Sequence, residues 1–269
     1  MSNTRSRNPK HGRRAWTVRL LVSVGILSVL PAPVRAQADL RPLMQSVRGS
    51  VLPVGTFNPL SSPRFNFRGS GFVVGDGNLL LTNAHVLPDP SAGPAGQLAV
   101  LVMRPDGGRE PRVATLLRVD RSRDLALLKL DGAPLPALTL APAGGVQEGL
   151  DVALVGFPIG GVLGFAPVIH RGIVSSLTTI ALPAPTAQQL PERTAARLRQ
   201  DAYSVYQLDA TAYPGNSGGP LLDARTGQVV GVINMVLVHS TRESALSNPT
   251  GITYAIPAQF GLELLKQQP

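Results

Sequence analysis

Three side chains in this sequence are of types that together can hydrolyse an amide bond. His85 follows a short apolar run, Asp124 opens another, and Ser217 lies in the glycine-rich turn 215–219. A serine hydroxyl is too weakly acidic to attack an amide alone, so a histidine must take its proton. A carboxylate must then hold that histidine in the right tautomer and stabilise the imidazolium that forms. We therefore predict that His85, Asp124 and Ser217 form a catalytic triad.

The glycines around Ser217 predict the second part of such a site. Attack on a carbonyl places negative charge on its oxygen, and backbone N–H groups in a fixed turn can receive that charge. Glycine permits such a turn because it tolerates positive φ and a close approach of substrate. We assign the oxyanion donors to the backbone N–H groups of Gly215 and Ser217.

Plainer interpretations compete with these assignments. His85 could be an ordinary core or loop histidine, and Asp120 lies only four residues before Asp124. We expect Asp120 to end a strand or cap a turn. The three histidines after residue 36 show no clustered spacing, so we expect no metal site and no cofactor.

The turn around Ser217 also matches the G-x-S-x-G elbow of α/β-hydrolases. That fold requires the chain order serine, acid, histidine and helical crossovers between parallel strands. His239 is the only histidine after Ser217, and the sequence shows almost no amphipathic helical period. Lipase or esterase activity is therefore disfavoured.

The elements that must position these residues are short, often β-branched apolar runs separated by Gly, Pro, Asp and Asn. The runs are 71–74, 78–82, 98–103, 114–120, 125–130, 152–156, 170–176, 205–209, 220–223, 229–236 and 253–256. An Asp-Gly pair at 76–77 predicts a hairpin between the first two. Two segments could be helical, the polar stretch 186–202 and the stretch 257–267, which opens with proline. Many short strands without intervening helices predict an all-β sandwich or barrel.

Three motifs in this order resemble the trypsin-like peptidases of the HtrA/Deg type. They are T-N-A-H-V at 82–86, D-L-A-L-L at 124–128 and G-N-S-G-G-P at 215–220. The resemblance spans roughly residues 44–268, and the further segments that carry it are Gly69–Val73, Gly156–Pro158, Arg171–Ser175, Gln207–Ala210 and Gly251–Pro257. It implies a chymotrypsin-like fold of two six-stranded antiparallel β-barrels. His85 and Asp124 would come from the first barrel and Ser217 from the second.

The resemblance and the apolar runs together predict the domain boundaries. We expect a signal peptide at 1–36 and a protease domain at 37–268, with a first barrel at about 47–140, a second at about 147–257 and a C-terminal helix at about 257–267. Only residues 258–269 follow Pro257, so we expect the protease domain without a PDZ domain. The segment 177–204 is longer than the family pattern requires.

Charge and cysteine content exclude several classes of protein. The formal net charge is +9, but seven basic and no acidic residues lie in 1–36, which leaves 18 basic against 16 acidic residues beyond. A nucleic-acid partner is therefore not expected. The absence of cysteine excludes disulfides and thiol catalysis.

The N-terminus predicts an exported protein, periplasmic or secreted, of bacterial origin. A basic start, the apolar run 20–30 and the small-residue segment 34–38 describe a signal peptide cleaved after Ala36 or Ala38. The run is shorter than the roughly 20 apolar residues of a membrane span, so we expect no stable membrane insertion after cleavage. An uncleaved anchor is the alternative, and Arg13-Arg14 leaves the Sec and twin-arginine routes both open. Family trimers use N-terminal contacts, which residues 37–68 could provide.

In the family the residues just before the nucleophile line the primary substrate pocket. Here the two walls would be formed by Thr211, Ala212 and Tyr213 and by Ile233, Asn234 and Met235. None is charged, and an unpaired buried cation is costly, so we expect small or medium aliphatic residues rather than Arg or Lys. Asn216 stands where digestive zymogens carry an aspartate that pairs with a new N-terminal ammonium. An asparagine cannot form that ion pair, so we expect no activation by trimming beyond signal removal.

The sequence thus predicts an exported serine endopeptidase that acts on unfolded or exposed protein segments through an acyl-enzyme intermediate. The alternative is a binding or chaperone-like module that keeps the protease fold with low or latent activity.

Overall fold

The computed structural model describes residues 38–89, 96–104, 106–160, 164–180, 203–235 and 252–267, all within one unit of the chain, Ala38–Pro269. The predicted signal peptide at 1–36 and the predicted polar helix at 186–202 lie outside the described residues.

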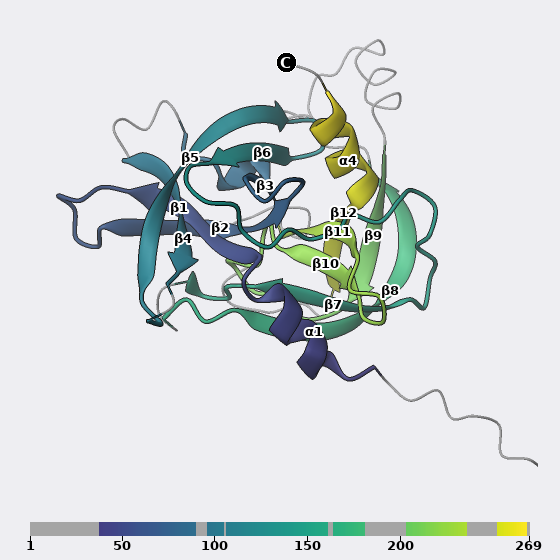
Figure 1. The fold of residues 1–269 in the computed structure, drawn as a ribbon. Helices are drawn as coiled ribbons and strands as arrows, with labels where there is room; N and C mark the ends of the chain where they lie inside the picture. Colours follow the sequence, from purple (N-terminus) through teal and green to yellow (C-terminus); the bar gives the residue numbers. More distant parts are fainter. Residues whose placement is uncertain are drawn as a thin grey trace, which may run out of the picture. The chain divides into compact units, whose positions relative to one another are not determined.

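The first six strands close into an antiparallel barrel (Figure 1). They are β1 (Val51–Phe57), β2 (Phe65–Val74), β3 (Leu79–Thr82), β4 (Gln97–Met103), β5 (Arg109–Asp120) and β6 (Leu125–Leu130), in the order β1-β2-β3-β6-β5-β4. The predicted Asp-Gly hairpin joins β2 to β3, where Val74 pairs with Leu79. Gly75 and Gly77 both take positive φ in this turn, at 66° and 93°.

The second barrel repeats this closure with the last six strands. They are β7 (Asp151–Gly156), β8 (Val168–Ile180), β9 (Tyr203–Asp209), β10 (Pro220–Asp223), β11 (Val229–Asn234) and β12 (Ile252–Pro257), in the order β10-β11-β12-β9-β8-β7. The prediction of two six-stranded antiparallel barrels with a C-terminal helix is confirmed.

One hydrophobic cluster joins the two barrels. Phe72 and Leu127 of the first barrel belong to the same buried cluster as Val155 and Val232 of the second. Burying one such side chain stabilises a fold by roughly 1.5–3 kcal/mol, so this shared core holds the barrels against each other. The described residues at the strand ends of the two barrels therefore have a fixed relation to one another.

Among the described residues, two α-helices lie outside the barrels. The helix α4 (Ala258–Lys266) begins after Pro257, and the buried side chains of Phe260 and Leu264 face the core, as the apolar stripe predicts. The helix α1 (Leu40–Val47) was not predicted. Asp39 caps its first turn, and Leu43, Met44 and Val47 pack on the shared core. In the part of the chain that is described, no helix is long and apolar enough to cross a membrane.

Candidate active site

The predicted triad residues come from three loops. His85 lies in the short 3-10 helix η1 (Ala84–Val86), which follows β3 directly, and Asp124 ends the turn that precedes β6. Because β3 and β6 are paired, with Thr82 opposite Ala126, these two residues emerge from neighbouring strand ends. Ser217 lies in the second barrel, in the loop between β9 and β10.

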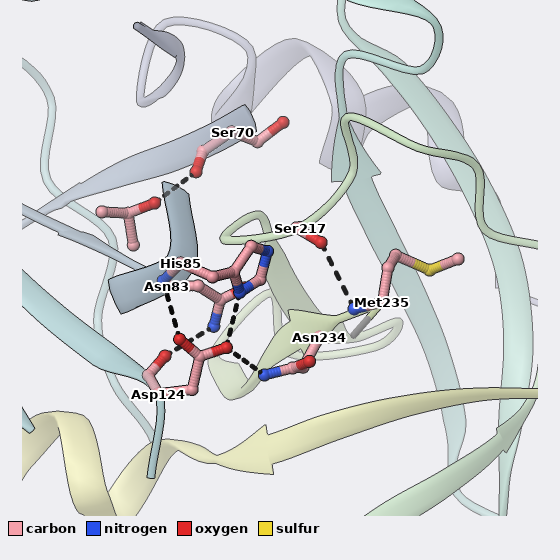
Figure 2. Close-up of polar contacts among 8 residues, drawn as sticks. Ser70, Asn83, His85, Asp124, Ser217, Asn234 and Met235 are labelled. Atoms are coloured by element: carbon pink, nitrogen blue, oxygen red, sulfur yellow. Dashed lines mark hydrogen bonds and ion pairs between the residues drawn. The ribbon is translucent and has the colours of Figure 1, made fainter. Parts of the chain in front are cut away.

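The structure brings His85 and Asp124 into direct contact (Figure 2). The Nδ1 atom of His85 lies 2.5 Å from Oδ2 of Asp124, and the His85 backbone N–H donates to Oδ1 at 2.8 Å. A carboxylate can only accept, so Nδ1 carries a proton, and in the neutral imidazole Nε2 then presents a lone pair. The Nε2 atom has no hydrogen-bond partner among the described residues and is free to act as a base.

Asn234 completes the surroundings of this carboxylate. Its Nδ2 atom donates to Asp124 Oδ2 at 2.7 Å, and the residue is fully buried. The backbone carbonyl of Asp124 also accepts from Asn83 Nδ2 at 3.0 Å and from the Ala84 N–H at 3.1 Å. The sequence placed Asn234 in a substrate pocket, whereas the structure directs its amide to Asp124. The Asp124 carboxylate thus accepts from three donors, the His85 backbone N–H, the His85 ring and the Asn234 amide, and these bonds fix its rotation.

Asp120, the competing acid, folds the turn that carries Asp124. Its Oδ1 accepts from Ser122 Oγ at 2.6 Å and from the Arg123 N–H at 3.1 Å, and its Oδ2 pairs with Arg123 Nη1 at 2.9 Å. Burial alone would raise the pKa of Asp120, but the hydrogen bonds from Ser122 and Arg123 outweigh it, so the net pKa is lowered. Asp124 itself sits at φ 55°, a conformation that aspartate adopts more readily than most residues.

Arg123 connects this turn to the C-terminal helix. Its guanidinium carbon lies 4.4 Å from the centre of the Phe260 ring, and Nη1 lies 3.8 Å from Glu263 Oε2. A cation over an aromatic face is attracted by the ring quadrupole. The helix α4 therefore supports the loop that presents the carboxylate.

The Ser217 hydroxyl is not bonded to the histidine. Its Oγ accepts a hydrogen bond from the Met235 N–H at 3.3 Å, and in the described part of the chain it has no hydrogen bond with His85. In Figure 2 the edge of the imidazole opposite Asp124 is turned toward Ser217. The hydroxyl proton is not used by the Met235 contact, because there the oxygen only accepts.

Two donors outside the turn fix the peptide groups before Ser217. The Ile159 N–H donates to the Pro214 carbonyl at 2.9 Å, and Ser70 Oγ donates to the Gly215 carbonyl at 2.6 Å. In a trans peptide the N–H points away from the carbonyl, so the bond to Pro214 sets the direction of the Gly215 N–H. Neither the Gly215 nor the Ser217 N–H has a partner among the described residues. These are the two groups predicted as oxyanion donors.

Ser70 was not singled out from the sequence, although it lies in one of the segments that carry the resemblance. Besides holding Gly215, its Oγ accepts from the Phe157 N–H at 3.1 Å. Its backbone N–H donates to the Ser217 carbonyl at 2.8 Å, and its own carbonyl accepts from Thr82 Oγ1 at 2.7 Å. One serine of the first barrel thus braces the nucleophile turn of the second.

The glycines at 215 and 218 leave no room for a side chain. A Cβ at Gly215, where φ is 101°, would come 2.3 Å from the Phe157 carbonyl oxygen. A Cβ at Gly218, where φ is 82°, would come 2.1 Å from the Ser70 carbonyl oxygen. Both positions therefore require glycine for conformation and for space.

Asn216 is fully buried, and neither atom of its side-chain amide has a hydrogen-bond partner in the described part of the chain. An aspartate here would bury a charge where the native amide has no described hydrogen-bond partner, and an unpaired buried charge costs several kcal/mol. A neutral side chain is thus the residue type that this environment admits.

Apart from Asn234, the residues predicted to line a substrate pocket differ in their exposure. Ala212 and Ile233 are buried in the core of the second barrel. Thr211 is exposed, and Tyr213 and Met235 are half-buried. The accessible part of the predicted pocket therefore comes from Thr211, Tyr213 and Met235.

His170 packs behind Tyr213, with 5.8 Å between the ring centres. Its Nε2 is buried without a partner among the described residues, and burial lowers its pKa from the ordinary 6.5. The unfolded chain therefore takes up this proton at a higher pH than the folded chain, and folding stability falls as pH drops below about 6.5.

We expect His170→Phe to remove this contribution while keeping an aromatic ring against Tyr213. Thermal unfolding followed from pH 7.5 to pH 5 should show a smaller loss of Tm in the variant than in the wild type. Every other titratable group is common to both proteins, so the difference isolates His170. Parallel curves would show that His170 is not the group responsible.

Comparison with known proteins finds similar sequences and similar folds. Residues 69–232 match the family model described as a trypsin-like peptidase domain. A probable periplasmic serine endoprotease, DegP-like, from Pseudomonas fluorescens is 31% identical over 199 residues, which are 74% of this chain and 34% of that protein. The chain thus spans about a third of the length of the curated relatives it matches first.

Two solved structures are similar in fold. The active form of the Rv3671c protease from M. tuberculosis has a TM-score of 0.61 and 24% identity, covering 87% of this chain and 90% of that one. The HtrA-type protease AlgW with a decapeptide has a TM-score of 0.58 and 26% identity, covering 83% of this chain and 65% of that one.

Proposed function

Because the chain belongs to the trypsin-like peptidase domain family, we propose that it is a serine endopeptidase in which Ser217 is the nucleophile, His85 the general base and acid, and Asp124 the acid that orients His85. The observation that carries this proposal is the His85–Asp124 pair, in which Nδ1 meets the carboxylate and the opposite edge of the ring, with Nε2, is turned toward Ser217. The similarity to a DegP-like endoprotease supports the same assignment.

The reaction begins when the Ser217 hydroxyl leaves its contact with Met235 and turns to His85 Nε2. Rotation of the hydroxyl about χ1 between staggered wells is a fast motion. As Oγ attacks the carbonyl carbon, its proton passes to Nε2. The Asp124 carboxylate stabilises the imidazolium that results.

The N–H groups of Gly215 and Ser217 receive the developing oxyanion. Both are free of other partners among the described residues, and both are held in place before substrate arrives. Preorganised donors of this kind stabilise a transition state without any cost of reorganisation. His85 then gives its proton to the leaving amine, an ester remains on Ser217, and water activated by the same histidine hydrolyses it.

The proposal also covers the export of the protein and its substrates. The Pseudomonas relative is named as a periplasmic protein, and the predicted signal peptide at 1–36 would export this chain as well. Unfolded or exposed protein segments with small or aliphatic residues at the cleavage site are the proposed substrates, and trimer formation through residues 37–68 stays a prediction.

A serine-directed fluorophosphonate tests the proposal against the alternative of a binding module with latent activity. The missing bond between Ser217 and His85 is the observation that favours the alternative. We expect the probe to label Ser217 and to stop the cleavage of unfolded casein at internal bonds. Binding of casein with neither labelling nor cleavage would favour the binding module.

The support of the Pro214 carbonyl by Ile159 gives a further prediction. Ile159→Pro removes the N–H that holds this carbonyl and cannot adopt the native φ of 58°. Loss of one oxyanion donor costs about 10²- to 10³-fold in kcat, and we expect a fall of about 10²-fold.

Ile159→Gly is the matched control for this position. It keeps the N–H, and glycine adopts positive φ without strain, while the Ile159 side chain is already 54% exposed. We expect it to retain most of the activity. Equal losses in the two variants would show that the side chain, and not the N–H, is what matters.

A further inference from the structure

A cavity of about 570 Å³ opens beside His85, on the first-barrel side of the site. Its volume falls within the roughly 300–1,000 Å³ of small-molecule sites. Its lining includes Ala84 and His85 of the η1 turn, the three leucines Leu87, Leu98 and Leu116, and the two arginines Arg68 and Arg121. The cavity thus combines an aliphatic surface with positive charge next to the proposed general base.

Neither of the two arginines that line the cavity has an ion-pair partner among the described residues. Arg68 is held in place by neutral acceptors, because its Nε donates to the Val86 carbonyl at 2.7 Å and its Nη2 to the Leu87 carbonyl at 2.8 Å. Asp89 also lines the cavity, and it already has an interaction of its own. The lining therefore holds two positively charged side chains and one negatively charged side chain, so its net charge is positive.

We propose that this cavity is a substrate subsite for an acidic side chain, with glutamate favoured over aspartate. The methylenes of a glutamate would lie on the leucines, and its carboxylate would meet the guanidinium of Arg121, with the fixed charge of Arg68 nearby. Guanidinium groups suit carboxylates because their planar fork can donate two parallel hydrogen bonds. The inference rests on the proposed function, because the glutamate would belong to a peptide substrate that is bound for cleavage.

The position of the cavity limits which substrate residue it can receive. His85 lines the cavity and must also reach the leaving amine at the scissile bond. An extended peptide advances about 3.3 Å per residue, so the acidic side chain belongs to a residue within a few positions of that bond. This subsite is separate from the predicted pocket formed by Thr211, Tyr213 and Met235, where small or aliphatic residues are expected.

Peptide binding to the Ser217→Ala variant tests the subsite without any need for turnover. Pairs of fluorescent peptides differ only in Glu or Gln at one of the positions from three before to three after the cleavage site. At one position we expect the Glu peptide to bind about fivefold more tightly, as charge pairs near a surface allow, and the difference should shrink in 0.5 M NaCl.

Adding Arg121→Gln should bring the Glu peptide to the level of its Gln partner. Adding Arg225→Gln, an equal charge change at an exposed position of the turn after β10, should leave the preference intact. Equal binding of Glu and Gln at every position, or a preference that Arg121→Gln leaves unchanged, would overturn the subsite. Cleavage of the Gln peptides by wild type is scored separately, so a failure of the proposed function is distinguishable from a failure of the subsite.

Discussion

Ser217→Ala is expected to abolish casein hydrolysis. The substitution removes the only atom proposed to form the ester, and triad residues act as a unit, so the loss should be about 10⁴- to 10⁶-fold in kcat. The fold should persist, because the hydroxyl makes one long hydrogen bond, from Met235 at 3.3 Å, and a small side chain remains in the buried turn.

Initial rates of casein cleavage and thermal unfolding of both proteins provide the measurement. Ser204→Ala is a matched control, since it makes the same chemical change at an exposed position of β9. It should retain full activity. Comparable activity in Ser217→Ala and wild type, with equal Tm values, would mean that another residue is the nucleophile.

Asp124→Asn is expected to lower kcat by about 10⁴-fold at neutral pH, the loss known for this change in serine protease triads. The native carboxylate accepts three hydrogen bonds, two from His85 and one from Asn234. An amide has one oxygen, so in either orientation its NH₂ meets a group that donates in the native protein. If it meets Nδ1, the ring must take the tautomer with the proton on Nε2, and His85 can no longer accept the proton of Ser217.

Asp120→Asn is the control for this variant. It makes the same change four residues away, where the carboxylate binds Ser122 and Arg123 and not His85. We expect a lower Tm, because the ion pair with Arg123 is lost, but a far smaller fall in kcat. If Asp120→Asn removed as much activity as Asp124→Asn, the assignment of the orienting acid would be wrong.

The local parts of the fold could be predicted from the sequence. The Asp-Gly hairpin, most of the strands and the helix after Pro257 depend on residues that are neighbours in the chain. The helix at 40–47 was missed although Asp39 precedes Leu40, Leu43, Met44 and Val47 at helical spacing. Strand β1 was missed because Pro53 and Gly55 interrupt its apolar run. In the structure Gly55 sits at an irregularity of the pairing, where a Cβ would come 2.2 Å from the Asn66 carbonyl oxygen.

The residues that position the candidate site could not be found in this way. Asn234 reaches a carboxylate 110 positions earlier, and Ser70 holds a carbonyl 145 positions later. Hydrogen bonds of this kind exist only once both barrels have closed, and neither residue carries a local pattern that identifies its partner. The three triad candidates were recognisable because the residues next to them in the sequence are distinctive. Asn234 and Ser70 reach the site only through the arrangement of the strands in the folded protein.

Trapping the acyl-enzyme tests the central claim, that Ser217 forms the covalent intermediate, most directly. Wild-type protein is mixed with an activated ester or a peptide ester, quenched in acid within milliseconds to seconds, digested and examined by mass spectrometry. The account predicts one added acyl group per chain, located on Ser217 in the peptide that contains residues 215–219, and none in Ser217→Ala. An acyl group on another residue, or continued turnover with none on Ser217, would contradict it.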